Sequence, residues 1–401
     1  MRKPGIVMGV IAVLAPGQGA QSPGMLAPWL DLPGAPELVG ELSEVAGLDL
    51  LRLGTTADAD EIKDTAVTQP LIVALGLLAA PHLGLDDASA GASVVAGHSV
   101  GELTAASVAG ALAPRAAVGF AARRGAAMAA ACALVPTGMS ALLGGDPDEV
   151  VAAIEAAGLT PANRNGAGQI VSAGALSDLA KLAAEPPPGV RVRPLPVAGA
   201  FHTSYMAPAE AVLQDYAATL DITDPHHLLL SNADGTAVAE GAALRERLVA
   251  QVTLPVRWDL CLRTLSDLNV SAAVELPPAG TLTGIAKREL PGVELLALKT
   301  PDDLDAARRL IRSQPQHGQG EYTPDFQVVV APAKGVFTPA TVAEGTQLRR
   351  GTLLGTVRTN REEHSIVAGS AGVLLEWLRR EGDIVAAGLP VARLSNGTEA
   401  P

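Results

Sequence analysis

The feature that most constrains the fold is an apolar run that leads directly into a glycine-flanked serine. Residues 94–96 are Val-Val-Ala, and residues 97–101 are Gly-His-Ser-Val-Gly. The apolar run predicts a buried strand, and the residues from Val100 to Leu112 predict a helix. A sharp turn between them would lift the Ser99 hydroxyl above the sheet, as a nucleophile requires. A serine that only caps a helix fits the bare pattern too, so the surrounding residues must decide.

The chain around this turn predicts an α/β fold. Buried-strand patterns at residues 9–14 and 94–96 alternate with helical stretches such as residues 68–78, which indicates a parallel sheet covered on both faces. Signals of the same type return at residues 227–231 and 271–275. We therefore assign residues 1–135 and 199–312 to one α/β subdomain.

Residues 136–198 have a different pattern and predict an inserted subdomain. Asp146, Pro147 and Glu149 predict a helix start, and Ser177 is expected to cap a second helix. The resulting order of strand, helix, two strands, helix and strand is that of a ferredoxin-like unit. The four strands are expected at residues 139–143, 160–163, 168–172 and 190–197.

The C-terminal part carries an internal repeat. Residues 313–325 are polar and contain Pro, Gly and Gln, which predicts a linker. Beyond them, pairs such as Gly335-Val336 and Gly372-Val373 recur with an offset of 37 residues. Short apolar segments that are punctuated by glycine and repeated once predict an all-β sandwich over residues 326–396.

Composition excludes several functions. The formal net charge is −13 and aromatic residues make up 2%, which disfavours nucleic-acid binding. Two cysteines, Cys132 and Cys261, cannot form a disulfide framework or a cysteine-rich zinc site, so we expect no metal. We also expect no membrane span, because no apolar run has the required length. The apolar residues 6–14 predict a first strand better than a signal peptide, which favours a cytoplasmic protein.

A nucleophilic serine needs a base, and His202 is the best-placed histidine. It lies in the sequence Ala-Phe-His-Thr at residues 200–203, directly after the inserted segment, where two subdomains should meet. His98 is the neighbour of Ser99, but adjacent side chains on a tight turn point in different directions. No aspartate or glutamate is evident as a third member of a triad.

Arg124 is the candidate for binding an anion. It lies in a segment made almost wholly of alanine and apolar residues, and a buried arginine without an anion is costly. A guanidinium that faces the cleft can hold a carboxylate bidentately. Two arginines, Arg123 and Arg124, on a solvated helix face are an equally good explanation of these residues alone. The glycine-rich loop at residues 16–21 lacks the spacing of a dinucleotide or phosphate loop, but it can supply an oxyanion amide.

Together these motifs resemble the malonyl-CoA:acyl carrier protein transacylases of type II fatty acid synthesis and the acyltransferase domains of polyketide synthases. The resemblance covers about residues 9–310. It implies a hydrolase-like α/β subdomain that carries a ferredoxin-like one. One departure is the loop at residues 275–280, which is Glu-Leu-Pro-Pro-Ala-Gly where the family has E-x-GPG. The five motifs that carry the resemblance lie, in order, at residues 16–21, 68–70, 97–102, 124–125 and 200–203.

The resemblance also implies residue roles. Ser99 would take the malonyl group as an ester, with His202 as general base and then acid. Gln251 would orient His202 through its backbone carbonyl, which accounts for the missing acid. The main-chain amides of Gln18 and Val100 would form the oxyanion hole. Residues implied to bind substrate are Arg124, for the malonyl carboxylate, Phe201, His98 and Asn163.

The C-terminal 75 residues resemble a lipoyl/biotinyl carrier domain. The repeat carries this resemblance, together with the sequence Glu-Gly-Asp-Ile-Val at residues 381–385. Such domains present a modifiable lysine on the hairpin between the two halves. The hairpin here, residues 359–362, has Arg361 at that place. We therefore expect an unmodified accessory domain.

The expected function is malonyl transfer from malonyl-CoA to an acyl carrier protein, by a ping-pong route and without a cofactor. Neither nucleic acid nor membrane is an expected partner. The residues leave three alternatives open. They are a serine hydrolase or thioesterase, a polyketide-type acyltransferase, and a non-catalytic scaffold that binds a carrier protein.

Overall fold

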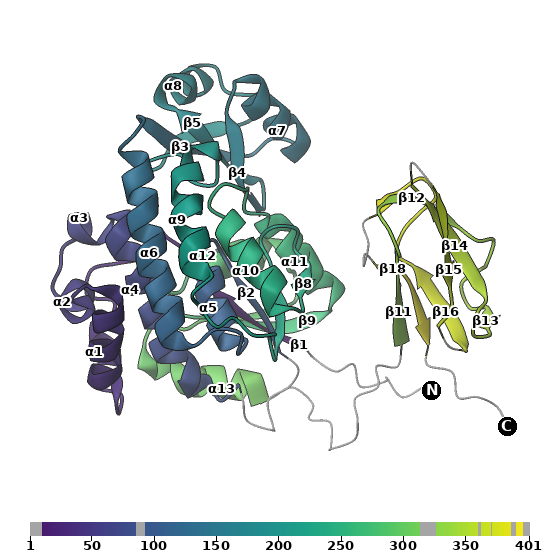
Figure 1. The fold of residues 1–401 in the computed structure, drawn as a ribbon, viewed down its shortest axis with the longest axis horizontal. Coiled ribbons are helices and arrows are strands. Elements are labelled where there is room, and N and C mark those ends of the chain that lie inside the picture. Colours follow the sequence, from purple (N-terminus) through teal and green to yellow (C-terminus); the bar gives the residue numbers. More distant parts are fainter. Residues whose placement is uncertain are drawn as a thin grey trace. The chain divides into compact units, whose positions relative to one another are not determined.

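Two compact units, Met1–Gln316 and His317–Pro401, make up the structure, a computed structural model (Figure 1). It describes residues 10–85, 93–312, 326–359, 362–369, 371–385 and 390–395. The predicted linker, residues 313–325, lies outside this set, as does the predicted hairpin tip with Arg361.

The first unit is built on a six-stranded sheet in the order β10-β9-β1-β2-β7-β8. All neighbouring pairs are parallel except β7 and β8. The central strands β1 and β2 are buried and almost wholly apolar, as a sheet covered on both faces requires. The predicted parallel sheet is therefore confirmed. Its strands are β1 (Val10–Ala15), β2 (Ser93–Gly97), β7 (Leu228–Leu230), β8 (Ala237–Val238), β9 (Val270–Glu275) and β10 (Glu294–Ala297).

Alternate residues of β1 point to opposite faces of the sheet, and each face has its own core. Ile11 and Val13 join the larger core, which most helices of the unit line, whereas Ala12 and Leu14 pack against α11 and α12. Helices α11 (Trp258–Asp267) and α12 (Thr281–Glu289) cover that second face. The larger core contains residues of α1 (Ala35–Ala46), α2 (Leu50–Thr55), α3 (Ala59–Ile62), α4 (Thr65–Ala79), α5 (Gly101–Val108), α6 (Pro114–Cys132), α9 (Ala207–Ala217), α10 (Gly241–Ala250) and α13 (Leu304–Arg312).

One helical stretch, Thr65–Leu83, is long and apolar enough to cross a membrane. The expectation that no apolar run reaches this length is therefore wrong. Its apolar window is 78% buried within the fold, and α4 packs against α6. In the described part of the chain this stretch is a core helix, apolar on all sides because protein surrounds it.

The inserted segment forms a four-stranded antiparallel sheet in the order β4-β5-β3-β6, with α7 and α8 packed on it (Figure 1). The predicted helix start is confirmed, because the Asp146 carboxylate accepts the N–H groups of Asp148 and Glu149. The elements are β3 (Thr137–Leu143), α7 (Pro147–Ala156), β4 (Thr160–Gly166), β5 (Gln169–Ala175), α8 (Leu176–Ala184) and β6 (Arg191–Pro194).

Two details of this segment differ from the expectation. Ser177 does not cap α8, because β5 leads directly into the helix, which begins at Leu176 with Ala175 as its N-cap. The last strand is shorter than residues 190–197 and ends at Pro194. One backbone hydrogen bond to β3 follows it, from the Leu195 N–H to the Met139 carbonyl oxygen.

The second unit confirms the internal repeat strand by strand. Each strand of its second half begins 37 residues after its counterpart in the first half, for example β16 after β12. The two four-stranded sheets, β11-β18-β16-β13 and β15-β14-β12-β17, contain counterparts at equivalent places. The strands are β11 (Phe326–Val330), β12 (Gly335–Pro339), β13 (Gln347–Leu348), β14 (Leu353–Arg358), β15 (Glu363–Val367), β16 (Gly372–Trp377), β17 (Ile384–Val385) and β18 (Pro390–Ser395).

Candidate active site

Ser99 lies at the turn between β2 and α5 with a φ of +53°, in the left-handed region. Both flanking glycines allow a close passage of the backbone. A Cβ on Gly97 would lie 2.1 Å from backbone atoms of Gly101, and one on Gly101 would lie 2.2 Å from the Ala15 carbonyl oxygen. The predicted sharp turn is confirmed, and neither glycine can be replaced without moving the strand or the helix.

His202 lies directly against Ser99. Its Nε2 is 2.8 Å from Ser99 Oγ, and its Nδ1 is 2.8 Å from the backbone carbonyl oxygen of Gln251. A carbonyl only accepts, so Nδ1 carries the proton and Nε2 is left to accept from the serine hydroxyl. Burial lowers the pKa of His202 to about 3, and the nearby Arg124 guanidinium acts in the same direction. The imidazole is therefore a neutral base at physiological pH.

Arg124 is buried in α6, with 2% of its surface exposed. Its Nη1 donates to Gln69 Oε1 at 2.7 Å, and its Nη2 donates to Gln251 Oε1 at 2.8 Å and to Ser99 Oγ at 3.2 Å. These partners are all neutral. Burial lowers the pKa of Arg124 to about 10, so the group stays charged at neutral pH. The alternative of a solvated arginine pair is wrong for Arg124 and holds only for Arg123, which is exposed.

The glycine-rich loop after β1 lies against the serine turn. A Cβ on Gly17 would be 2.4 Å from the His98 carbonyl oxygen, so the loop backbone touches the turn itself. Gln18 follows Gly17 directly in this loop, and Val100 is the N-cap residue of α5. Backbone N–H groups at the start of a helix favour negative charge.

These side chains can carry out acyl transfer. A hydroxyl, a neutral base and a buried cation meet within hydrogen-bonding distance, and glycine-permitted backbone surrounds the hydroxyl. In the described residues, no group of three or more His, Cys, Asp or Glu side chains is placed to hold a metal ion.

A family model described as the acyl transferase domain matches residues 13–316, which is most of the chain and ends where the first unit ends. The chain belongs to the acyl transferase family. It is 57% identical over 302 residues to the malonyl CoA-acyl carrier protein transacylase of Mycobacterium tuberculosis. The aligned region covers 75% of this chain and 100% of that relative.

Solved structures resemble the same part of this acyltransferase. The crystal structure of MCAT from Mycobacterium tuberculosis has a TM-score of 0.73 at 57% identity, with 75% of this chain and 99% of that one covered. A malonyl-transacylase in complex with its type II PKS acyl-carrier protein has a TM-score of 0.69 at 27% identity, with 75% and 99% covered.

The other residues predicted to bind substrate are His98, Phe201 and Asn163, and each has a different environment. The His98 side chain contacts other residues: its Nε2 is 2.8 Å from Asn165 Oδ1, and its ring contacts Trp258 edge-on. Phe201 is buried beside His202. Asn163 is buried in β4, and the contact with His98 comes from Asn165 instead. Substrate contacts by His98, Phe201 and Asn163 stay predictions.

Sequence reasoning missed four polar residues that hold the site. Gln69 binds Arg124, and Asn165 binds His98. Asn232 binds the backbone of Ser99 and Gly97, and Glu102 accepts from the side chain of Gln251. Gln69 and Glu102 belong to motifs that carried the family resemblance, but nothing local in the sequence indicates what each touches.

Proposed function

We propose that this acyltransferase moves a malonyl group from malonyl-CoA to the phosphopantetheine thiol of an acyl carrier protein, through an ester on Ser99. One observation carries the proposal: a buried arginine with neutral partners lies 3.2 Å from the oxygen of the serine that His202 activates. The free carboxylate of malonyl, which one methylene separates from the thioester carbonyl, is the anion such a cation pairs with.

The first half-reaction follows from the hydrogen bonds. Ser99 Oγ attacks the thioester carbonyl while His202 Nε2 takes the hydroxyl proton. The backbone N–H groups of Gln18 and Val100 stabilise the oxyanion. When the C–S bond breaks, His202 returns the proton to the CoA thiolate, and malonyl-Ser99 remains.

The second half-reaction is the reverse with a new thiol. The carrier thiol gives its proton to His202 and attacks the ester carbonyl, and His202 then protonates Ser99 Oγ as it leaves. The carbonyl of Gln251 stabilises the imidazolium that forms in both steps and keeps the ring in one orientation. This backbone acceptor takes the place of a triad carboxylate.

A cleft supports the approach of a long thioester arm. It has a volume of about 560 Å³ and lies between the β4–β5 hairpin and α11. Gln169 in its wall accepts from Asn165, and Asn165 contacts His98, the neighbour of Ser99. We propose that the pantetheine chain of CoA and of the carrier approaches Ser99 from this side.

The polyketide-type alternative is kept because one structural neighbour is a malonyl-transacylase in complex with a type II PKS acyl-carrier protein. The two candidate functions share all of the chemistry above and differ only in the carrier. Transfer rates to a fatty acid carrier and to a polyketide carrier, measured side by side, distinguish them.

We further propose the finer domain assignment. The strand order β4-β5-β3-β6 supports a ferredoxin-like subdomain at residues 136–198, inserted in a hydrolase-like one at residues 1–135 and 199–312. Two matched four-stranded sheets support a lipoyl/biotinyl-like domain over residues 326–396. Arg361 in place of lysine supports an unmodified domain, and intact mass after coexpression with lipoyl and biotin ligases tests this.

The test of the function is a two-stage reaction. The protein is mixed with malonyl-CoA and phosphopantetheinylated carrier, and malonyl-carrier and free malonate are quantified. We expect malonyl-carrier as the main product. Free malonate alone would identify a hydrolase, and neither product would identify a non-catalytic scaffold.

A further inference from the structure

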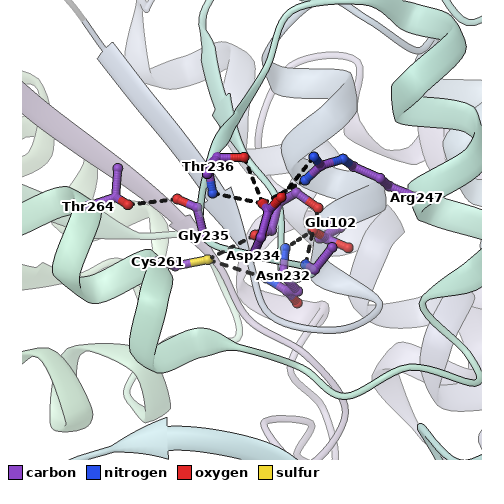
Figure 2. A network of polar contacts seen from close by, with 10 residues as sticks. Glu102, Asn232, Asp234, Gly235, Thr236, Arg247, Cys261 and Thr264 are labelled. Atoms are coloured by element: carbon purple, nitrogen blue, oxygen red, sulfur yellow. Dashed lines mark hydrogen bonds and ion pairs between the residues drawn. The ribbon is translucent and has the colours of Figure 1, made fainter. Parts of the chain in front are cut away.

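Glu102 is a buried carboxylate to which the steps above assign no role. It lies in the first turn of α5, three residues after Ser99, with 5% of its surface exposed (Figure 2). Its Oε1 accepts the backbone N–H of Asn232 at 2.5 Å, and its Oε2 accepts from Nε2 of Gln251. A buried carboxylate is costly, so these two contacts call for an explanation.

The Asn232 contact holds the serine turn. Asn232 Oδ1 accepts the N–H of Ser99 at 2.8 Å, and its Nδ2 donates to the Gly97 carbonyl oxygen at 2.7 Å. One side chain thus binds the N–H of Ser99, a residue in a strained conformation, and the carbonyl of Gly97 two residues before it. Glu102 fixes the backbone of that side chain (Figure 2).

The contact between Glu102 and Gln251 bears on the orientation of the Gln251 side-chain amide. An ionised carboxylate only accepts, so the NH₂ group of Gln251 must face Glu102 and its Oε1 must face the opposite way. There Oε1 accepts from Nη2 of Arg124. Nε2 of Gln251 donates to the Ser99 carbonyl oxygen as well, at 3.1 Å, so Glu102 and Ser99 together hold the NH₂ group. With the amide reversed, NH₂ would meet the guanidinium, donor against donor, and Arg124 would lose this partner.

We infer that Glu102 is a positioning residue for malonyl selectivity: as an acceptor it fixes the Gln251 amide, which in turn holds Arg124 beside Ser99. The inference rests on the proposed function, because it concerns the residue that binds the malonyl carboxylate. It predicts that malonyl transfer depends on Glu102 being ionised.

The surroundings of Glu102 make its ionisation accessible to experiment. Burial raises the pKa of Glu102 to about 8. Four groups act in the opposite direction and lower this pKa: the Asn232 N–H, Arg124 on α6, Arg247 on α10 and Ser231. Cys261 on α11 also faces it, and its own pKa is raised mainly by burial. A proton on Oε2 would make it a donor that faces the Gln251 NH₂ group, so the hydrogen bond by which Glu102 holds the amide would be lost. Malonyl transfer should then rise as pH passes through about 8.

The test compares Glu102→Gln with the wild-type protein at pH 6.5 and pH 9. Two rates are measured: formation of malonyl-Ser99 from malonyl-CoA, and modification of Ser99 by an uncharged sulfonyl fluoride, which needs no Arg124. In the wild type the ratio of the two rates should rise about tenfold between these pH values, the effect of a hydrogen bond to a charged group. The ratio for Glu102→Gln should stay low at both.

Asp234→Asn is the matched control. Asp234 lies in the same network, where it forms a bidentate ion pair with Arg247 that is partly exposed (Figure 2). This variant should keep the wild-type rise of the ratio. If Glu102→Gln fails to fold, Gln251→Met replaces it, because that change also removes the amide oxygen from Arg124. Its ratio should likewise be low and independent of pH.

Two results would overturn the inference. One is a Glu102→Gln ratio that rises with pH as in the wild type, and the other is an equal loss of both rates with an unchanged ratio. A wild-type protein that reacts with the sulfonyl fluoride but never forms malonyl-Ser99 would instead contradict the proposed function itself.

Discussion

The two units of this protein bury different kinds of side chain. In the first, a buried arginine, glutamate, histidine and glutamine meet around one serine: Arg124, Glu102, His202 and Gln251. In the described part of the second, the buried side chains are all apolar, as around Phe337. Buried polar groups are costly unless they are hydrogen-bonded, so a chain gathers them where chemistry needs them. The contrast assigns catalysis to the first unit.

The relatives divide the chain at the same place. The acyl transferase match ends at residue 316, and the Mycobacterium tuberculosis relative covers 75% of this chain while being covered completely itself. The second unit is therefore additional to what that relative contains. If the contrast in buried polarity is informative, changes in the first unit should alter chemistry, and changes in the second should not.

The largest effect is expected from Ser99→Ala. A double displacement has no substitute nucleophile, so turnover should fall by several orders of magnitude and no malonyl ester should form. Mass spectrometry after exposure to malonyl-CoA measures the ester. Ser172→Ala is the matched control, because Ser172 is also buried and its hydroxyl has no hydrogen-bond partner within the described residues. An ester on the Ser99→Ala protein would place the nucleophile elsewhere.

Arg124→Ala should cost malonyl transfer about 2–5 kcal/mol, the effect of removing one member of a buried charge pair. Transfer from acetyl-CoA, which has no free carboxylate, should be kept or increased. Steady-state rates with both substrates measure the difference, and Arg123→Ala, which changes the exposed neighbour, should alter neither. Equal losses with the two substrates would make Arg124 a structural residue.

Apart from the rise near pH 8 that Glu102 should cause, the pH dependence of malonyl transfer should lack the acid limb of an ordinary histidine. Because the pKa of His202 is lowered from 6.5 to about 3, the neutral base persists as pH falls below 6.5. The same shift destabilises the fold in acid: the stabilising contribution is present above pH 6.5 and is lost as pH falls toward 3. A kcat/KM profile together with unfolding measured from pH 7 to pH 4 tests both points. A fall in kcat/KM centred near 6.5, in protein that is still folded, would contradict the neutral-base assignment.

A smaller effect is expected at the carrier-binding surface. Acyl carrier proteins are acidic and this chain has a net charge of −13, so docking needs a local basic patch. Arg191 and Arg193 are both exposed on β6. Reversing both charges should raise the apparent KM for the carrier several-fold and leave the malonyl-CoA half-reaction unchanged. If the carrier KM does not move, the patch lies elsewhere, with Lys287 and Arg288 as the next candidates.

The smallest effect on chemistry is expected from deleting residues 316–401. The proposed catalytic residues all precede them, and the described contacts of those residues lie within the first unit. The truncated protein should be soluble, with a first half-reaction close to normal. A large drop in its thermal midpoint would assign the second unit a stabilising role. Loss of the malonyl ester would contradict the assignment of catalysis to the first unit alone.

Local sequence patterns predicted much of the fold but only some of the residues of the candidate active site. The buried strands, the glycine-flanked turn and the 37-residue repeat each have a local signature, and each is confirmed. Gln251 came only from the family resemblance. Its partner Glu102 is 149 residues away in sequence, and Asn232 is 133 residues from Ser99. Which loops meet above a sheet depends on tertiary packing, which local periodicity does not encode.

The helix and strand ends were missed for a related reason. Ser177 has a good capping side chain, but β5 runs into α8 without a loop and the helix has already begun. Tertiary connections thus override a local preference of about 1 kcal/mol.

The central claim is that Ser99, in the first unit, is the residue that carries the malonyl group. The most direct measurement is peptide mapping of the full-length protein after brief exposure to malonyl-CoA without a carrier. We predict one malonyl group on the peptide that contains Ser99, and its disappearance when phosphopantetheinylated carrier is added. A malonyl group on a peptide of the second unit, or one on Ser99 that the carrier cannot remove, would contradict this account.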